Sequence, residues 1–347
     1  MIKLSLSQPR NVVRSLGRGR AIMNLLLNQF QKTLRMTKMN GVPCYLTLET
    51  GNICNLQCVL CPTGQKRREL SKGFLQFETF QKIVDSFAKH LMFLEFYNWG
   101  EPFLNPDLLK MIRYARNRNI FVIVSSNMNF RDLSFDQAKE IVESGLNQLL
   151  VFCAGASDNT IKRYQKGATF TRAYANMQAI QSAKKFLKRN TPFVQWRLLM
   201  TRHTELELEH AKVMSRTCCD YLTPLPIHCD MAKEVFLNPE ERFQNVEHWL
   251  PANEALCDYD KINRIEKKMR NSCSYLWSKI TVHWNGDCFP CCKLFNDSFT
   301  FGNLLSSSPN TVWNSLKYQT ARKIALGKKF DDNTVICSVC SENKAMT

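Results

Sequence analysis

The sequence predicts an α/β fold, a partial (β/α)6 TIM-like barrel followed by a small C-terminal domain built from a β-hairpin and a helix. Six short apolar segments alternate with helical patterns between residues 44 and 226. This alternation is typical of βαβ units that form a parallel sheet, and six units are too few to close an eight-stranded barrel. Farther along, the pair Asn285-Gly286 lies between two short runs and predicts a hairpin.

The individual elements follow from apolar runs and from helical periodicity. The expected strands are Tyr45–Thr50, Met92–Tyr97, Ile120–Ser125, Gln148–Cys153, Phe193–Met200 and Asp220–Pro226. The helical patterns between them cover residues 76–89, 105–118, 133–144, 158–188 and 204–217. In the C-terminal part we expect a hairpin of Lys279–Trp284 and Asp287–Cys292, followed by a helix over 309–326.

Length and composition indicate the organisation of the chain. At roughly 150 residues per domain, 347 residues suggest two domains. We expect an arm over residues 1–40, the barrel over 41–230, a linker over 231–272 and the small domain over 273–347. A hydrophobic content of 44% excludes a disordered chain. No segment has the roughly 20 apolar residues that span a bilayer, and no signal peptide is visible, so we expect a cytoplasmic protein.

The first forty residues are strongly basic. They contain eight Lys or Arg, the first acidic residue is Glu49, and the net charge of the whole chain is +17. Apolar residues at helical spacing predict an amphipathic helix over 21–37, namely Ile22, Leu26, Phe30 and Leu34. We expect this helix to pack its apolar face on the domain. A membrane surface, an acidic partner and an organellar transit peptide are the alternatives, whereas nucleic acid is not expected, because no recognised nucleic-acid module follows.

Three of the 15 cysteines stand directly after the first expected strand. Cys54, Cys58 and Cys61 have the spacing Cys-x3-Cys-x2-Cys. Three thiolates on one loop can hold three corners of a 4Fe–4S cluster and leave its fourth iron open to a ligand. Zinc, which usually takes four ligands, and a chance cluster are the alternatives.

The spacing of this loop resembles that of the radical S-adenosylmethionine (SAM) enzymes. Two later strand ends strengthen the resemblance: Gly100-Glu101-Pro102 is similar to the family segment that receives the amino group of SAM, and Ser125-Ser126-Asn127 is similar to the turn that contacts its ribose. The carboxyl ends of parallel strands are where such barrels place their chemistry. The resemblance implies SAM contacts from Gly100, Glu101, Pro102, Ser125 and Asn127, with Gly100 admitting the ligand and Glu101 facing the ammonium.

The next two strands give weaker indications. Phe152-Cys153-Ala154-Gly155 stands where many relatives carry a Ser-Ile-Asp-Gly-like segment, and Cys153 reads as a core thiol, with a catalytic thiol as the alternative. On the fifth strand Gln195 and Arg197 share one face, which predicts a polar barrel lumen. Arg197 is our candidate catalytic residue, meeting the SAM carboxylate or an anionic substrate group. A surface arginine is the alternative.

A second group of cysteines occupies the C-terminal 75 residues. With Gly286, Phe301-Gly302-Asn303 and Trp313-Asn314, they resemble the auxiliary iron–sulfur domain of the SPASM/twitch group. The resemblance implies one auxiliary 4Fe–4S cluster, as in twitch-type enzymes, held by Cys273, Cys291, Cys337 and Cys340. Cys288 or Cys292 could replace Cys291, and a structural zinc site is the alternative for the whole set.

The resemblance implies a radical SAM oxidoreductase. Such an enzyme cleaves SAM reductively to a 5′-deoxyadenosyl radical, removes hydrogen from a substrate carbon and passes an electron to the auxiliary cluster. We expect it to dehydrogenate a small, anionic metabolite, such as a sugar or aminocyclitol, and to receive electrons from a flavodoxin or ferredoxin. Arg197, Asp230 and Glu234 are the candidates for the base. A peptide-modifying maturase and a non-enzymatic iron–sulfur or zinc interaction protein are the alternatives.

Overall fold

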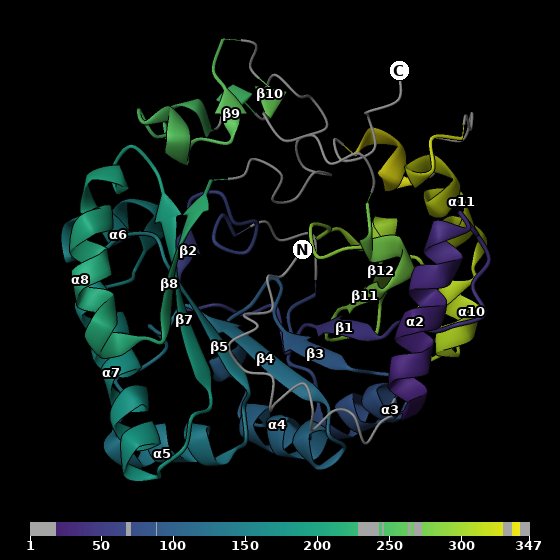
Figure 1. Cartoon of the computed structure of the whole chain (residues 1–347), viewed down its shortest axis with the longest axis horizontal. Coiled ribbons are helices and arrows are strands. Elements are labelled where there is room, and N and C mark those ends of the chain that lie inside the picture. Colours follow the sequence, from purple (N-terminus) through teal and green to yellow (C-terminus); the bar gives the residue numbers. More distant parts are fainter. Residues whose placement is uncertain are drawn as a thin grey trace.

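The computed structural model describes residues 19–66, 71–87, 89–227, 243–244, 246–262, 273–328 and 335–340, and the backbone of 265–266. One curved, mostly parallel sheet dominates the fold, in the order β12-β11-β1-β3-β4-β5-β7-β8 (Figure 1). Its strands are β1 (Tyr45–Leu48), β3 (Phe93–Phe96), β4 (Phe121–Ser126), β5 (Gln148–Cys153), β7 (Phe193–Met200), β8 (Tyr221–Pro226), β11 (Lys279–Val282) and β12 (Cys288–Phe289).

Helices cover the outer face of this sheet (Figure 1). They are α3 (Phe77–Phe87), α4 (Leu108–Asn117), α5 (Phe135–Glu143), α6 (Asp158–Tyr164), α7 (Phe170–Phe186) and α8 (Leu208–Cys218). Alternate strand residues such as Leu46, Leu94 and Val194 are fully buried in the core that includes the apolar side chains of these helices. The predicted partial barrel is therefore confirmed, and strands β5 and β7 have the bounds expected from the sequence.

Two predicted helices are each divided in the structure. The expected helix over 158–188 is α6 and α7, separated by a short strand β6 (Gln165–Lys166) and by Gly167, whose φ is +92°. Strand β6 pairs with β2 (Gln57–Cys58), so the interruption supports the cysteine loop. The expected helix over 309–326 is α10 (Pro309–Trp313) and α11 (Leu316–Ala325), and Ser315 caps the latter by accepting from the Tyr318 amide.

The C-terminal hairpin is part of the barrel sheet. Strand β11 pairs in parallel with β1, placing Lys279 opposite Tyr45, and β12 pairs antiparallel with β11. The sequence predicts this hairpin as an element of a separate small domain. In the structure it covers the edge of β1 that the other barrel strands leave open, and it thereby brings the C-terminal cysteines to the barrel.

Helix α2 (Gly19–Thr33) lies alongside α10 and α11 (Figure 1), but with the opposite face inward to that expected. Its buried residues are Ala21, Asn24, Asn28 and Gln31. Leu26, Phe30 and Leu34, expected to pack on the domain, are 56%, 61% and 55% exposed. The expectation was wrong because side-chain amides on the inner face bind the backbone of the following segment, as described below.

Candidate active site

The first cysteine loop connects β1 to α3 and gathers three thiols. Cys54, Cys58 and Cys61 lie near enough to influence one another electrostatically. Burial, reinforced by the neighbouring acidic groups Glu101 and Cys61, raises the pKa of Cys54 to about 12. The loop is held by the Cys61 amide, which donates to the Cys58 carbonyl at 3.2 Å, and by the β2–β6 pairing.

The donor set of this loop fits an iron–sulfur cluster. It offers three soft thiols, and thiolates are the usual ligands of a 4Fe–4S cluster. A cavity of about 200 Å³ lies beside the loop, lined by residues 52–57, Thr63, Lys66 and Lys72. Within the described parts of the chain, no three His, Cys, Asp or Glu side chains converge as ligands of a single metal ion.

Glu101 joins the loop after β3 to the end of β4. Its Oε1 accepts from the Ser126 hydroxyl at 2.8 Å and from the Phe103 amide at 3.2 Å, and its Oε2 accepts from the Asn127 amide at 2.9 Å. Burial raises the pKa of this carboxyl to about 7, although these hydrogen bonds oppose the shift. A carboxylate has about four acceptor positions, so the three hydrogen bonds within the described residues leave one position unused.

Close backbone packing around residue 100 requires a glycine at this position. A Cβ at this position would lie 1.9 Å from the carbonyl oxygen of Gly51 and 3.0 Å from that of Ile53. The Ile53 carbonyl, one residue before Cys54, accepts from the Glu101 amide at 2.9 Å. We expected Gly100 to admit a ligand, but the space beside its Cα is filled by backbone of the cysteine loop. Pro102 is buried at the start of the 3-10 turn η2 (Pro102–Leu104).

The end of β4 lies against the cysteine loop. The Asn127 side chain donates to Asn55 Oδ1 at 3.1 Å and is 3.9 Å from the sulfur of Cys54. Ser125 is half-buried on the lumen face of β4. Ser126, whose hydroxyl binds Glu101, was missed as a site residue, and the only signal for it is its place between the two residues that were named.

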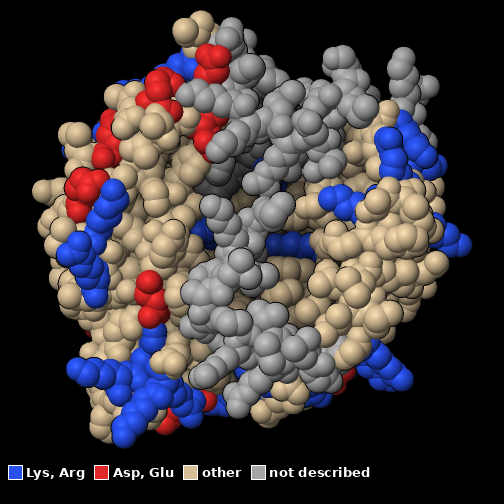
Figure 2. All heavy atoms as spheres, in the orientation of Figure 1, with Lys and Arg blue, Asp and Glu red and all other residues tan. Residues whose placement is uncertain are grey.

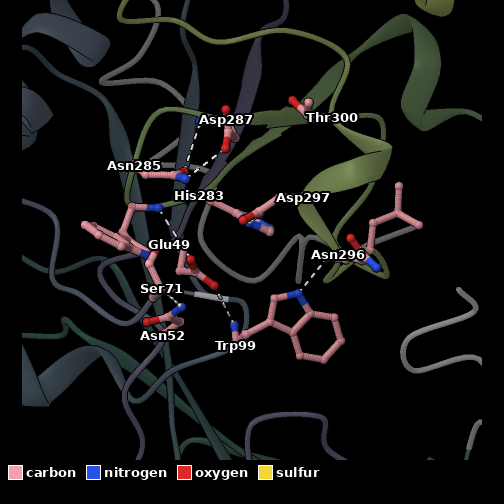
Figure 3. A network of polar contacts seen from close by, with 12 residues as sticks. Glu49, Asn52, Ser71, Trp99, His283, Asn285, Asp287, Asn296, Asp297 and Thr300 are labelled. Atoms are coloured by element: carbon pink, nitrogen blue, oxygen red, sulfur yellow. Dashed lines mark hydrogen bonds and ion pairs between the residues drawn. The ribbon is translucent and has the colours of Figure 1, made fainter. Parts of the chain in front are cut away.

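A second buried carboxylate, Glu49, follows β1 and joins three parts of the site (Figure 3). It accepts from the backbone amide of Trp99 at 3.2 Å and from that of Trp284 at 3.4 Å. Burial raises its pKa to about 7. The indole of Trp99 also donates to the Leu294 carbonyl at 2.6 Å, so the residue before Gly100 is held by the C-terminal hairpin region. Nothing in the sequence indicated these long-range contacts.

The C-terminal cysteines have two kinds of neighbour: other cysteines, and residues of the barrel. Cys291 lies within electrostatic range of Cys273 and Cys340, and Tyr318 lies within that range of both Cys291 and Cys337. Cys273, Cys291 and Cys340 therefore lie near one another, with Cys292 beside them, and Cys337 lies near the same tyrosine as Cys291. That Cys273, Cys291, Cys337 and Cys340 hold the auxiliary cluster stays a prediction. Of the two alternatives to Cys291, Cys288 donates its thiol to the Gly286 carbonyl at 3.5 Å, and Cys292 lies near Lys279 and Tyr97 in the barrel.

The lumen of the barrel is polar, as predicted from β7. Gln148 donates to Gln195, and Gln195 donates to Thr223. Deeper in the molecule, Lys279 makes a buried ion pair with Glu95 at 2.9 Å. Lysine or arginine side chains are visible at the floor of the central hollow (Figure 2).

Arg197 lies half-buried on β7. Burial raises the pKa of the Tyr97 phenol, and Arg197 lies close enough for its positive charge to oppose that rise. Arg197 makes no hydrogen bond and no ion pair with any residue that the structure describes. The other candidate bases, Asp230 and Glu234, lie outside the described residues. Cys153 is fully buried in the core between sheet and helices, as expected of a core thiol.

Comparisons with known proteins agree with this geometry. Residues 48–194 match the radical SAM superfamily, and residues 273–341 match SPASM, an iron–sulfur cluster-binding domain. A curated relative is the tungsten-containing aldehyde ferredoxin oxidoreductase cofactor-modifying protein of Pyrococcus furiosus, 23% identical over 86% of this chain and 87% of its own length. Mycofactocin maturase MftC of Mycobacterium ulcerans is 30% identical over 102 residues, which are 29% of this chain and 26% of that protein.

Among solved structures, Streptococcus suis SuiB bound to S-adenosylmethionine has a TM-score of 0.60, at 11% identity over 84% of this chain and 70% of that one. Native anSMEcpe with bound AdoMet has a TM-score of 0.56, at 14% identity over 82% and 84% of the two chains. These two likenesses concern the fold. Because residues 48–194 and 273–341 match these two family models, the chain belongs to the radical SAM superfamily, is a radical SAM enzyme and carries a C-terminal SPASM iron–sulfur domain.

Proposed function

We propose that this enzyme dehydrogenates a small anionic metabolite, of which a sugar or an aminocyclitol is an example. When bound, SAM and its cluster would supply a 5′-deoxyadenosyl radical able to take a hydrogen atom from a substrate carbon. The substrate radical would then lose a proton to a base or to solvent, and an auxiliary cluster would be the acceptor of its electron. The observation that carries the proposal is Arg197, a cation in the lumen without a protein counter-ion among the described residues.

The chain's own residues divide the work between its two groups of cysteines. Cys54, Cys58 and Cys61 hold the SAM-binding cluster, and Glu101 keeps one acceptor position for the SAM ammonium while fixing the turn at Asn127. In the C-terminal group, Cys273, Cys291, Cys337 and Cys340 are proposed to hold one auxiliary cluster, which would make the domain twitch-type. A flavodoxin or ferredoxin is the proposed electron donor.

Charge in the lumen favours an anionic substrate. The ammonium of Lys279 is neutralised by Glu95, which also accepts from the Thr47 hydroxyl at 3.1 Å. The guanidinium of Arg197 has no such partner, and removing an unpaired cation from water is costly unless an anion pairs with it. A planar guanidinium binds carboxylate or phosphate through two parallel hydrogen bonds, so Arg197 is the residue that we expect to orient the substrate.

A peptide-modifying maturase is the second candidate. The similarity to mycofactocin maturase MftC over 102 residues favours it, and so does the solved structure of SuiB bound to its precursor peptide SuiA, as a likeness of fold. The two candidates differ in what stimulates SAM cleavage, namely a small anion or a peptide.

The test uses anaerobic holoenzyme and the rate of 5′-deoxyadenosine formation under dithionite. Anionic small-molecule fractions of a cell extract, separated by anion exchange, are expected to stimulate the rate and to yield a product that is two hydrogens lighter. Arg197→Met is expected to raise the concentration needed for half-maximal stimulation by about tenfold or more, a loss typical of a charged hydrogen bond.

The matched control is Lys185→Met, which removes an equal charge from the exposed surface of α7. If only peptides stimulate the rate, the enzyme is a peptide-modifying maturase and the dehydrogenase proposal is wrong. Incorporation of solvent deuterium without a change of oxidation state would show a redox-neutral reaction instead of a dehydrogenation. An unchanged response in Arg197→Met would remove the substrate-binding role of this residue.

A further inference from the structure

Helix α2 presents a continuous apolar stripe to solvent. The positions follow the spacing i, i+3, i+4, i+7 and i+11, which is one face of a helix. The exposed fractions of these residues range from 37% to 65%, for Met23, Leu26, Leu27 and Phe30 on the helix and for Leu34 in the turn directly after it. Single exposed apolar residues are ordinary, whereas a contiguous exposed patch marks a binding surface.

Specific hydrogen bonds fix this orientation of the helix. Asn24 both donates to the Val42 carbonyl at 2.9 Å and accepts from the Val42 amide at 3.0 Å, and Asn28 donates to the same carbonyl at 2.7 Å. Gln31 accepts from the amides of Asn40 and Gly41. Turning the apolar stripe inward would break this set, so the stripe is held outward by the fold.

The surroundings of the stripe carry positive charge. Residues 19–48 and 309–328, which include α2, α10 and α11, each contain four Lys or Arg and no Asp or Glu, and of these eight basic residues only Arg322 is buried. Arg35 links the two segments by donating to the Leu326 carbonyl at 2.6 Å. Basic side chains are visible along this edge of the molecule (Figure 2). In the sequence, residues 1–18, which precede α2, contain four more Lys or Arg and no Asp or Glu.

We propose that α2 docks this enzyme on an anionic phospholipid surface, with the stripe inserted among the lipid headgroups. Apolar residues combined with basic neighbours are the properties of helices that lie in the membrane interface, and each Lys or Arg near such a surface adds attraction. In the described part of the chain, no helix has the length and hydropathy needed to cross a bilayer. A second copy of the chain is disfavoured as the occupant, because two equally basic faces repel.

The test is co-sedimentation of the full-length protein with vesicles of phosphatidylcholine alone or of phosphatidylcholine mixed with phosphatidylglycerol. We expect binding to the mixed vesicles that weakens as salt is raised, because salt screens surface charge. Leu26→Gln/Phe30→Gln is expected to weaken binding by about tenfold or more, because two apolar side chains that would be buried in the membrane interface are lost.

The control is Leu206→Gln/Ile262→Gln, which changes two apolar residues that are each 92% exposed elsewhere on the surface. Circular dichroism and iron content report whether each variant folds. Failure of the wild type to bind mixed vesicles would overturn the proposal, as would equal binding by both double variants. If Leu26→Gln/Phe30→Gln instead abolishes a dimer seen by light scattering, the stripe is a contact between copies and the membrane proposal is wrong.

Discussion

Gly100→Ala is the substitution whose effect follows most directly from the geometry of the site. The added methyl group would lie 1.9 Å from the carbonyl oxygen of Gly51. An ordinary contact is 3.4 Å or more, so the backbone of residues 51–53 and the loop of Gly100 must separate by 1.5 Å. Both neighbours are backbone atoms, so a change of rotamer cannot relieve the clash.

That displacement acts on both halves of the SAM site. The Ile53 carbonyl, which accepts from the Glu101 amide, immediately precedes Cys54. Separating the two segments therefore stretches this 2.9 Å hydrogen bond and moves the first cluster ligand away from Glu101. A misplacement of about 1 Å can reduce catalysis about 100-fold, and overpacking costs about 1–3 kcal/mol of stability.

The assay is formation of 5′-deoxyadenosine by anaerobic, reconstituted enzyme under dithionite, together with iron content and apparent melting temperature. We expect Gly100→Ala to lose at least about 100-fold in rate. Gly19→Ala is the matched control, because a Cβ there meets nothing within 4 Å. A Gly100→Ala enzyme with a rate close to wild type and full iron content would refute the argument that this glycine sets the distance between the two segments.

Three further predictions concern buried charges and cluster ligands. Lys279→Met leaves Glu95 buried without its cation and should lower the free energy of unfolding by about 3–5 kcal/mol; Glu95→Gln/Lys279→Met should recover part of this loss in thermal unfolding. Cys291→Ser should remove about four irons per chain in colorimetric iron analysis, whereas Cys288→Ser should keep them. Because burial raises the pKa of Glu49 to about 7, its carboxyl contributes most to stability below its ordinary pKa. That contribution, up to about 3 kcal/mol, is lost as the pH rises through 7. Melting temperatures at pH 5.5 and pH 8 should therefore differ less in Glu49→Gln, and an equal difference would contradict the assignment.

The sequence was sufficient for the parallel strands, because buried strands of a βα barrel are short apolar runs separated by amphipathic helices. The ends of those strands then located the cysteine loop, Glu101 and Asn127 in one place. The division of the predicted helix over 158–188 was missed because the interruption depends on pairing with the cysteine loop, a contact made across the fold.

The orientation of a helix on the fold was harder to predict than the presence of the helix. The spacing of Leu26, Phe30 and Leu34 predicted a helix correctly, but the same spacing cannot say which face turns inward. That face was decided by Asn24 and Asn28, whose amides bind the backbone of Val42. The role of Glu49 was likewise outside the reach of a sequence pattern, because its two donors are 50 and 235 residues away in the chain.

The most direct test of the central claim counts iron in two anaerobically reconstituted proteins, the wild type and Cys54→Ala/Cys58→Ala/Cys61→Ala. We expect about eight irons per chain in the wild type, and about four in the variant together with loss of 5′-deoxyadenosine formation. Four irons in the wild type would contradict the claim that the chain holds a second cluster, and with it the dehydrogenation that uses this cluster as electron acceptor. SAM cleavage that persists in the variant would contradict the assignment of the first loop.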